Sequence, residues 1–397
     1  MKIGEKLDFE LCAREILLLC MLCYPVILMR FIEGEKIFRT ILVFFVLLVL
    51  LLQFVYRRVN WCEAKAITKV IGVWLIAVLF LLAVHHRPGF TDYIVIPFVV
   101  LLLYFLTANS QCPARVLYVS SAVFCILMAG LQYYDVFYLH HVRGGLEDNP
   151  VPFAQGCTFM IGVVLIGVMD LIERKDKLIF IALCMLAALA GLYLLYLSQT
   201  RGAQIAVGVL LVFMLARCIY RKEYFLGAVI GLVIVIAAIY TYQRFLVGFN
   251  ELSAFADSSN RDTSWGIRLQ LWGISWVGLQ DHPLVGWGPN CLAKILESHP
   301  EILKTYHWIT DAHFHSDFFN LAATGGTVLL AGYFWLVGGL AWLARKNVGA
   351  LWAVVNLLVL GFSDCPFWSN QVVATFYMTY LLFMRCVPLQ SDKPIVG

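Results

Sequence analysis

Residues 201–242 read RGAQIAVGVLLVFMLARCIYRKEYFLGAVIGLVIVIAAIYTY, and this stretch decides the class of fold. It holds two apolar runs, near residues 201–219 and 224–241, with Arg221 and Lys222 in the short turn between them. Each run approaches the roughly 20 residues that an α-helix needs to cross the hydrocarbon core of a bilayer. A basic turn is typical of the cytoplasmic side of a membrane protein. The stretch therefore predicts two antiparallel spanning helices.

The same pattern recurs along most of the chain. Hydrophobic residues make up 61% of the 397 residues, charged residues make up 14%, and the mean hydropathy is +0.83. A soluble protein of this length needs far more polar surface. The net charge of +4 is too small to indicate nucleic-acid binding. We therefore predict an all-α, polytopic membrane protein of about 12 transmembrane helices. They lie near residues 14–30, 40–56, 66–84, 92–108, 115–134, 153–173, 177–197, 201–219, 224–241, 316–344, 348–363 and 371–387.

The short basic loops predict how these helices are oriented. Lysine and arginine follow the second, sixth, eighth and tenth predicted helices. An even number of helices separates these loops, so the positive-inside rule places them and both termini in the cytoplasm. Arg30, Lys36 and Arg39, after the first helix, disagree with this assignment. We divide the chain into transmembrane helices over 1–241, an outer loop over 242–315, and further transmembrane helices over 316–397.

The outer loop over residues 242–315 is far longer than an ordinary connection. Loops beyond about 12–15 residues are usually functional or disordered, but the composition of this one indicates structure. Residues 266–280 place apolar side chains at helical spacing, which predicts an amphipathic helix on the membrane interface. The segment 281–289 is rich in Pro and Gly and ends that helix. Tryptophan recurs through the loop, at Trp265, Trp272, Trp276, Trp287 and Trp308.

The cysteines do not form a metal-binding pattern. Most of the 12 cysteines lie inside apolar runs, where they act as small apolar residues. Cys291 and Cys365 fall in predicted outer loops, where they could pair if that side is oxidising.

Two arginines are candidates for binding an anion on the outer side. Arg201 stands at the outward N-terminus of a predicted helix, where a cation opposes the helix dipole unless an anion also binds there. An arginine that extends to the membrane interface is the competing interpretation. Arg268 lies in the predicted loop helix, and its competing interpretation is a solvated helix face. Arg244 and Arg261 are weaker candidates of the same kind.

A third polar feature comes just before the helix predicted at 316–344. It runs from Asp311 through His313 and His315 to Ser316 and Asp317. Ser316 is a plausible N-cap, and Asp317 suits the first turn of the helix. His315 would lie beside the free N–H groups of the helix start, able to accept a proton. Alternating Asp and His could instead bind a metal, or the cluster could only cap the helix.

The three features together indicate a single site. All lie on the predicted outer side, and two of them lie at outward helix N-termini. Two arginines and two helix N-termini that face one space suit a multiply charged anion such as a pyrophosphate. A neighbouring histidine would supply a base. None of this identifies a substrate.

Several motifs are similar to those of a known family. His315, Ser316 and Gly326 match a pattern of His, then Asn, Ser or Gln, then nine residues and Gly. Arg201 follows the seventh predicted helix within Gln199-Thr200-Arg201-Gly202. Arg268 and Trp272 match an Arg-then-Trp element, and residues 282–288 match His-Pro-Leu-x-Gly-x-Gly.

On these motifs the chain resembles bacterial O-antigen ligases, in the superfamily that also holds O-antigen polymerases and protein O-oligosaccharyltransferases. The likeness covers the whole predicted topology, but only the motifs are specific. A second glycine that the family often has is Leu329 here, which we interpret as a packing difference.

The resemblance implies transfer of a glycan from undecaprenyl pyrophosphate to a sugar hydroxyl of lipid A–core, at the periplasmic face of the bacterial inner membrane. It implies an inverting reaction without metal or cofactor. Arg201 and Arg268 would hold the pyrophosphate and stabilise its charge as it leaves. His315 would activate or orient the acceptor hydroxyl. The predicted substrate-binding residues are His313, Ser316, Asp317, Gln199 and Trp272.

Two other functions compete with the ligase. A polymerase, or a transferase to protein, of the same superfamily would use the same residues. A secondary transporter is the competitor from another class, because a dozen helices is a common transporter count. Transporters usually carry ionisable residues at mid-membrane. Here the charges gather at the predicted outer surface instead, which favours the enzyme.

Overall fold

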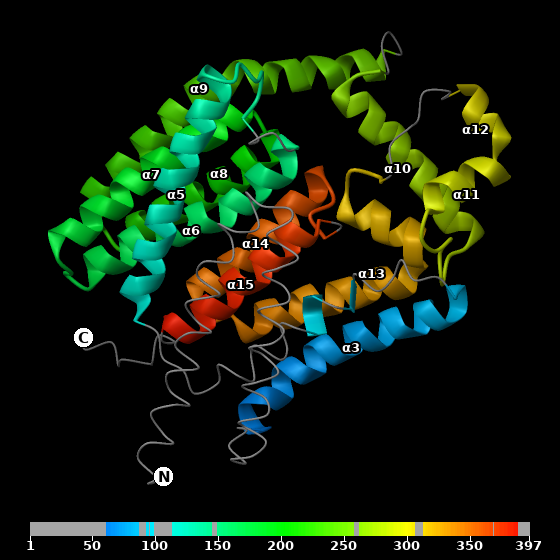
Figure 1. The fold of residues 1–397 in the computed structure, drawn as a ribbon, viewed down its shortest axis with the longest axis horizontal. Helices are drawn as coiled ribbons and strands as arrows, with labels where there is room; N and C mark the ends of the chain where they lie inside the picture. Colours follow the sequence, from blue (N-terminus) through cyan, green and yellow to red (C-terminus); the bar gives the residue numbers. More distant parts are fainter. Residues whose placement is uncertain are drawn as a thin grey trace.

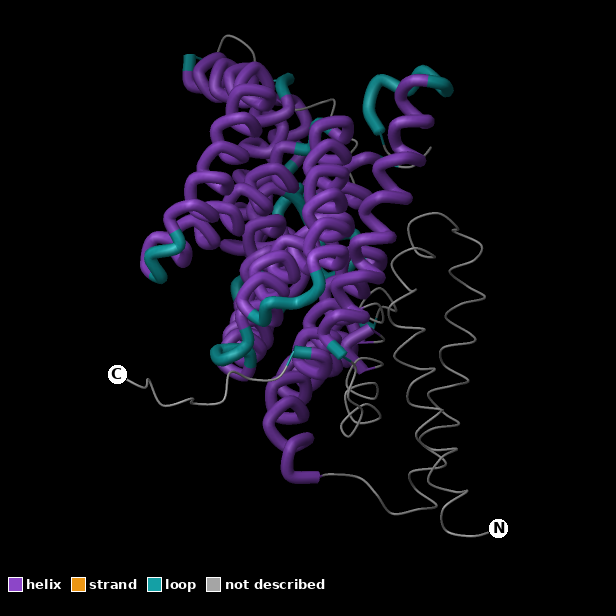
Figure 2. The backbone as a smooth tube through the Cα atoms, turned by 90° about the vertical axis from the view of Figure 1, so that its left-hand side faces the viewer, coloured by secondary structure: helices purple, strands orange, loops and turns teal. Residues whose placement is uncertain are grey.

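The computed structural model describes residues 61–86, 93–94, 96–98, 113–144, 149–257, 262–305, 313–367 and 369–387. This part of the chain is helical and contains no strand, as predicted for an all-α protein. Figure 2 shows long helices joined by short loops. Of the predicted helices, those near 14–30, 40–56 and 92–108 lie wholly or largely outside the described residues.

Seven helices in the described ranges are long and apolar enough to span a membrane, so the chain is a multi-pass membrane protein. The prediction of about 12 spans is therefore supported only in part. Two shorter helices, α14 (Val348–Ser363) and α15 (Asn370–Cys386), complete the bundle. The seven are α3 (Trp61–His85), α5 (Ala114–Phe137), α6 (Pro150–Glu173), α7 (Leu178–Ser198), α8 (Arg201–Tyr220), α9 (Tyr224–Ala256) and α13 (Asp317–Leu343) (Figure 1).

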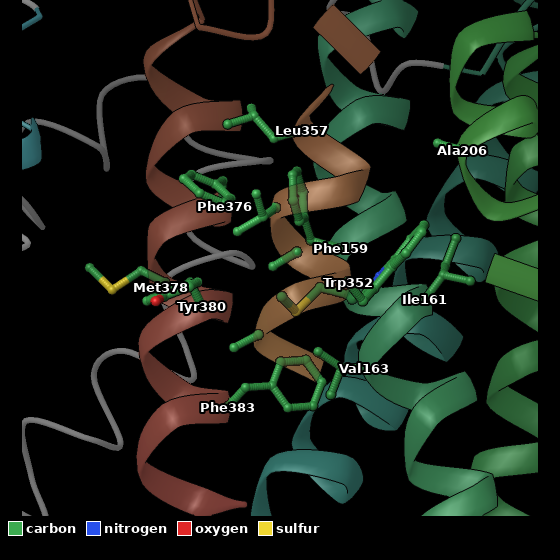
Figure 3. Close-up of a cluster of buried hydrophobic side chains, with 14 of the residues drawn as sticks. Phe159, Ile161, Val163, Ala206, Trp352, Leu357, Phe376, Met378, Tyr380 and Phe383 are labelled. Carbon is green, nitrogen blue, oxygen red and sulfur yellow. The ribbon is translucent and has the colours of Figure 1, made fainter. Parts of the chain in front are cut away.

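Helix α6 forms the centre of the bundle. It packs against α5, α7, α8, α14 and α15, and 89% of its apolar span is buried. Glycine makes part of this packing possible, because a Cβ at Gly162 would overlap the indole of Trp352. Figure 3 shows the resulting core, with Phe159 of α6 near Phe376 of α15. This core holds the helix ends that carry the polar residues described below.

Helix α9 is longer than its apolar run. The sequence predicts an end near residue 241, but the helix continues without a break to Ala256. Its 33 residues correspond to about 50 Å, more than the roughly 30 Å of a hydrocarbon core. In Figure 1 it crosses the top of the view toward α10. The boundary predicted at residue 242 therefore falls inside a helix, and the connection to α10 begins only at Asp257.

The segment between α9 and α13 is structured, as its composition indicates. It contains α10 (Ser264–Asp281), α11 (Cys291–Ser298) and α12 (Pro300–Thr305). Thr263 caps α10 by accepting a hydrogen bond from the N–H of Gly266 at 3.1 Å. Helix α10 packs against both α9 and α13, with Leu271 and Ile274 on its buried face. Cys291 is a free, buried thiol, as is Cys365, so the two do not pair in this structure.

Helix α13 is broken at Gly326, and the loop before α11 fills the break. Gly326 has φ 62° and ψ −157°, which only glycine adopts readily. The N–H groups of Trp287 and Gly288 donate to the carbonyls of Ala323 and Thr324 at 2.9 and 2.8 Å. In return, the N–H groups of residues 327 and 328 donate to the carbonyls of residues 283 and 284. The loop thus replaces the hydrogen bonds that the helix loses at the break.

Replacing Gly326 with alanine should destabilise the protein strongly. The backbone conformation costs a residue with a Cβ about 1–3 kcal/mol, and the added atom would lie 2.5 Å from the carbonyl of Leu284. We expect a combined cost of about 3 kcal/mol or more, visible as a drop of roughly 4 °C or more in the Tm of the detergent-solubilised protein. Gly338→Ala is the control, because nothing lies within 4 Å of its Cβ position. Equal Tm values for the two variants would contradict the role of the break.

Candidate functional site

The two ends of α8 carry different groups of charged residues. Arg201 is the first residue of α8, and Arg217 lies in its last turn. Arg217 lies 16 residues after Arg201 in this helix, a separation of about 24 Å. The basic residues that predict the cytoplasmic side gather at the Arg217 end, where Arg217 and Arg221 both pair with Glu173. The predicted site residues of α8 and α10 lie at the other end, which the next paragraphs describe.

Four arginines line one pocket at the Arg201 end of the bundle. They are Arg143, Arg201, Arg244 and Arg268, and we call this the arginine pocket. They come from separate parts of the chain: the loop after α5, the start of α8, the C-terminal half of α9, and α10. The remaining lining residues are Val151, Gln199, Thr200, Gly202, Ser264, Trp265 and Ser363. The structure therefore brings the predicted Arg201 and Arg268 together and adds two further guanidinium groups.

The arginine pocket has an excess of positive charge. Glu251 of α9 accepts hydrogen bonds from both terminal nitrogens of Arg201, at 3.1 and 3.2 Å. No acidic side chain is among the pocket's lining residues, and the four guanidinium groups outnumber the two carboxylates, Glu251 and Asp364, whose charges act on them. The pKa of Arg143 is lowered by burial and by the charges of Arg244, Arg201 and Arg268. Mutual repulsion of this kind is relieved by a bound anion, and more so by one with several charges.

Hydrogen bonds to neighbouring residues hold Arg143 and Arg268 in place. Arg143 donates through Nε to the carbonyl of Ser198 at 3.0 Å and through a terminal nitrogen to Oγ1 of Thr200 at 3.3 Å. Arg268 donates through Nε to the carbonyl of Ser363 at 3.2 Å. Burial lowers the pKa of Arg268, and the charge of Asp364 opposes that effect. Both guanidinium groups are therefore oriented before any ligand arrives.

Two histidines share one carboxylate beside the arginine pocket. Nδ1 of His315 lies 3.2 Å from Oδ1 of Asp364, and Nε2 of His313 lies 3.4 Å from the same oxygen. The histidine ring centroids are 4.3 Å apart. Burial alone would raise the pKa of Asp364, but the hydrogen bonds from His313 and His315 hold it well below its usual range. An ionised Asp364 can orient both rings and stabilise positive charge on either of them.

His315 also has an unusual backbone. Its φ of 50° lies in the left-handed region, which is uncommon for a residue other than glycine. Such strained residues gather at functional sites because the surrounding structure must hold them. Here the carbonyl of the preceding Phe314 accepts a hydrogen bond from Nε1 of Trp272 at 3.0 Å. This hydrogen bond from Trp272 of α10 therefore helps to hold His315 in its strained backbone conformation.

Two consecutive residues connect the arginine pocket with the histidine pair. Ser363, the last residue of α14, lines the arginine pocket and accepts from Arg268. Asp364, the next residue, contacts His313 and His315. The start of α8 packs close against this point, since a Cβ at Gly202 would overlap the hydroxyl of Ser363. An anion held by the arginines would therefore lie next to the histidines.

The other predicted substrate-binding residues have different surroundings. Gln199 ends α7 in a left-handed conformation and lines the arginine pocket. Ser316 is the N-cap residue of α13, but its hydroxyl donates to the carbonyl of Gly361 instead of capping the helix. Asp317 is buried and accepts from the N–H of Phe367 at 3.0 Å. Trp272 stacks on Phe319 with 4.9 Å between ring centroids, outside the pocket lining. Asp311 and Arg261 lie outside the described residues.

Three charged residues of this region did not emerge as candidates from the sequence. Asp364 follows α14, and Arg143 lies in the connection between α5 and α6. Glu251 belongs to the C-terminal half of α9, which the hydropathy pattern places in a loop. The predicted topology gives one indication of their relevance. The connections over residues 135–152 and 364–369, which contain Arg143 and Asp364, fall on the same predicted side of the membrane as His315. Nothing in the sequence indicates which residues of those connections meet.

A comparison with known protein families finds a match over a stretch of the chain that contains part of the candidate site. Residues 186–334 match a family model described as O-Antigen ligase. This segment belongs to the O-antigen ligase/polymerase superfamily. The match runs from within α7 to within α13, so it contains Arg201, Arg268 and His315. Arg143 and Asp364 lie outside it. No curated protein matches the chain.

The family implies a glycosyltransferase of the O-antigen ligase/polymerase type, acting on lipid-linked glycans in a membrane. Such an enzyme needs a place for the charged carrier and a base for the attacking hydroxyl. The arginine pocket and the His315–Asp364 pair have those two properties, and they adjoin each other.

His313, His315 and Asp364 also offer three ligand atoms within 4.8 Å of one another, a possible metal-binding set. Both histidine nitrogens face one oxygen of Asp364, however, and hydrogen bonds from protonated nitrogens account for this arrangement. In a glycan-transfer assay of the purified protein, we expect EDTA to leave the rate unchanged. Loss of transfer with EDTA, restored by a divalent cation, would show that the three residues hold a metal.

Proposed function

We propose that the protein transfers O-antigen polysaccharide from undecaprenyl pyrophosphate to the lipid A–core oligosaccharide, in lipopolysaccharide biosynthesis. The observation that carries this proposal is that the arginine pocket adjoins the His315–Asp364 pair. Ser363 lines the pocket, and Asp364, the next residue, contacts His315. The family match supports the same reaction class. No metal and no cofactor take part in the proposed step.

The proposed step is an inverting displacement at the anomeric carbon of the donor glycan. The oxygen of the acceptor hydroxyl forms a bond to that carbon, while the bond from the carbon to the pyrophosphate oxygen breaks. The bonding electrons leave with the pyrophosphate, and the hydroxyl proton passes to His315. The products are the glycan on its new acceptor and undecaprenyl pyrophosphate. His315 then returns its proton to water.

Asp364 determines which nitrogen of His315 is basic. When Nδ1–H donates to Oδ1 of Asp364, 3.2 Å away, Nε2 is the nitrogen that can accept a proton. The ionised carboxylate then stabilises the imidazolium that forms. Asp364 is therefore a positioning residue in this proposal, and His315 is the catalytic base.

The arginine pocket would bind the pyrophosphate and stabilise the charge that grows on it during transfer. Arg201 and Arg268 are the principal groups, as the resemblance implies, and Gln199 lies on the same wall. Binding would displace Glu251 from Arg201 or leave it as a counter-ion to the remaining arginines. His313, Ser316, Asp317 and Trp272 would support the histidine segment or the acceptor sugar near it.

Arg143→Gln should weaken binding of the lipid-linked donor while the protein stays folded. Losing one charged hydrogen-bonding group costs about 1.5–3 kcal/mol, so we expect KM for the donor to rise roughly tenfold or more. The change in kcat should be smaller, because the hydrogen bonds of Arg143 go to Ser198 and Thr200 and not to the His315–Asp364 pair. Arg345→Gln, at the opposite end of the bundle, is the control. An unchanged KM in Arg143→Gln would exclude Arg143 from donor binding.

The location that we propose is the bacterial inner membrane, with the site facing the periplasm. The basic residues near Glu173 lie at the end of the bundle opposite the arginine pocket. Under the positive-inside rule that end is cytoplasmic. Labelling of a cysteine introduced at Ser264 by a membrane-impermeant reagent in intact spheroplasts would test the orientation.

The nearest competing function is an O-antigen polymerase, and a protein O-oligosaccharyltransferase is the next. In vitro transfer with the purified full chain separates them. We expect glycan from the lipid-linked donor to appear on lipid A–core and not on a second lipid-linked glycan or a protein acceptor. Elongated carrier-linked product would identify a polymerase. A deletion strain should accumulate carrier-linked polymer and lack long lipopolysaccharide, whereas a polymerase mutant still shows the core with one repeat unit.

A further inference from the structure

A second pocket lies at the end of the bundle opposite the arginine pocket. The ends of α6, α8 and α15 and the starts of α5 and α14 surround it, and we call it the basic-end pocket. Its charged lining residues are Asp170, Glu173, Arg174, Arg217 and Lys346. Neither the family match nor the proposed transfer reaction assigns it a role, since Asp170, Glu173, Arg174 and Lys346 lie outside residues 186–334.

Positive charge exceeds negative charge around the basic-end pocket. Glu173 pairs with Arg217 at 2.5 Å and with Arg221 at 2.8 Å. Asp170 pairs with Arg174 at 2.8 Å and also accepts a hydrogen bond from the hydroxyl of Tyr118. In the described part of the chain, these two carboxylates thus face three arginine side chains. Nε of Arg217 is buried and has no acceptor among the described residues. The pocket therefore has capacity for an anion.

The start of α14 adds backbone donors to the same pocket. Asn347 caps the helix by accepting from the N–H of Ala350 at 3.0 Å, and its Nδ2 donates to the carbonyls of Phe383 and Val387. The N–H groups of Val348 and Gly349 make no hydrogen bond within the described part of the chain, and both residues line the pocket. Free N–H groups at the start of a helix bind phosphate well.

The remaining lining is apolar and continues onto the outer face of α8. Phe213 lines the pocket, yet 51% of its surface is exposed. Val209 and Val212, on the same helix, are 40% and 57% exposed. In a spanning helix this exposed apolar surface faces lipid chains. A ligand with a phosphate at one end and a hydrocarbon chain at the other fits both parts.

We propose that the basic-end pocket binds the phosphate headgroup of an anionic glycerophospholipid, with an acyl chain along the exposed face of α8. Basic pockets between spanning helices near one membrane surface are suited to such headgroups. Arg217 and Lys346 supply the charge, and the N–H groups of Val348 and Gly349 supply short directional hydrogen bonds to the phosphate. The site is independent of the proposed transfer reaction.

Native mass spectrometry of the full chain, delipidated in detergent, tests this site by binding alone. The probes are short-chain phosphatidylglycerol, phosphatidylcholine of the same chain length, and inorganic phosphate. Val348→Glu is the decisive variant, because a carboxylate in the first turn stabilises a helix and would take the place of the phosphate. Lys346→Glu is a second variant. Lys222→Glu is the matched control, since Lys222 is exposed at the same end and does not line the pocket.

We expect phosphatidylglycerol to bind at least tenfold more tightly than phosphatidylcholine, and inorganic phosphate to leave this binding undiminished at equal concentration. Val348→Glu and Lys346→Glu should each weaken phosphatidylglycerol binding tenfold or more, and Lys222→Glu should not. Equal binding of the two lipids would overturn the proposal. So would full competition by inorganic phosphate, which indicates an anion site without lipid, or unchanged binding in Val348→Glu, which would place the lipid elsewhere, the arginine pocket included.

Discussion

Replacing His315 with alanine should lower glycan transfer by about 10²–10⁴-fold while the protein remains in the membrane at normal abundance. This is the usual contribution of a general base that accepts the proton of an attacking hydroxyl. His315 is only partly buried and packs beside His313, so its loss leaves the core intact. His315→Asn is the sharper variant, because asparagine can still donate to Asp364 but cannot act as a base. Transfer from lipid-linked donor to lipid A–core, measured with purified protein, gives the rate.

Two further variants separate catalysis from positioning in the histidine pair. Asp364→Asn removes the charge and keeps the shape, and it should reduce kcat and alter its dependence on pH, because the carboxylate no longer stabilises the imidazolium. His299→Ala is the control, since His299 pairs with Asp281 and Glu301 and not with Asp364. Full transfer by His315→Ala would remove His315 from the proposed mechanism. An Asp364→Asn enzyme with the wild-type pH profile would show that Asp364 has only a structural role.

Replacing Arg201 with alanine should reduce transfer by about 10²–10³-fold, the typical effect of losing one donor that stabilises developing negative charge. Arg201 is 14% exposed at its side chain and lies against Glu251, which is 16% exposed. The single variant would therefore leave a partly buried carboxylate in the pocket, where it repels the pyrophosphate and destabilises the fold. The measured loss would combine these effects.

The double variant Arg201→Ala with Glu251→Gln separates them. It removes the unpaired carboxylate, so its Tm should return toward that of the wild type while transfer stays low. Arg115→Ala is the control for losing an arginine, since Arg115 pairs with Asp176 at the opposite end of the bundle. If the double variant recovered full transfer, the loss in Arg201→Ala would come from Glu251, and Arg201 would not stabilise the leaving group. Arg268→Ala should show a similar loss.

The apolar runs predicted several helices closely, because charged or helix-breaking residues bound them on both sides. The run near 201–219 became α8 (Arg201–Tyr220), and the run near 348–363 became α14 with the same limits. Helix α9 is different, because Gln243, Arg244 and Glu251 end the apolar run without ending the helix. Hydropathy detects where a helix leaves the bilayer, whereas the hydrogen-bond ladder determines where it ends.

The candidate site was predictable in part for a similar reason. Arg201, Arg268 and His315 belong to local patterns at helix ends, and the structure places Arg201 and Arg268 in one pocket. Their roles stay predictions. Asp364 belongs to no local sequence pattern. It reaches the site because the end of α14 packs against the start of α13, where the N–H of Asp317 donates to the carbonyl of Asp364. The sequence alone does not indicate that Asp364 packs against the start of α13.

The break in α13 has a consequence for how the protein is made. A spanning helix with unpaired carbonyls at Ala323 and Thr324 would be costly in a bilayer, because lipid offers no hydrogen-bond donors. The donors come from Trp287 and Gly288, which the ribosome synthesises before α13. The segment that carries Trp287 and Gly288 can therefore already lie across the membrane when α13 inserts into the bilayer. A chain in which that segment does not dock would leave the carbonyls of Ala323 and Thr324 without these donors inside the membrane.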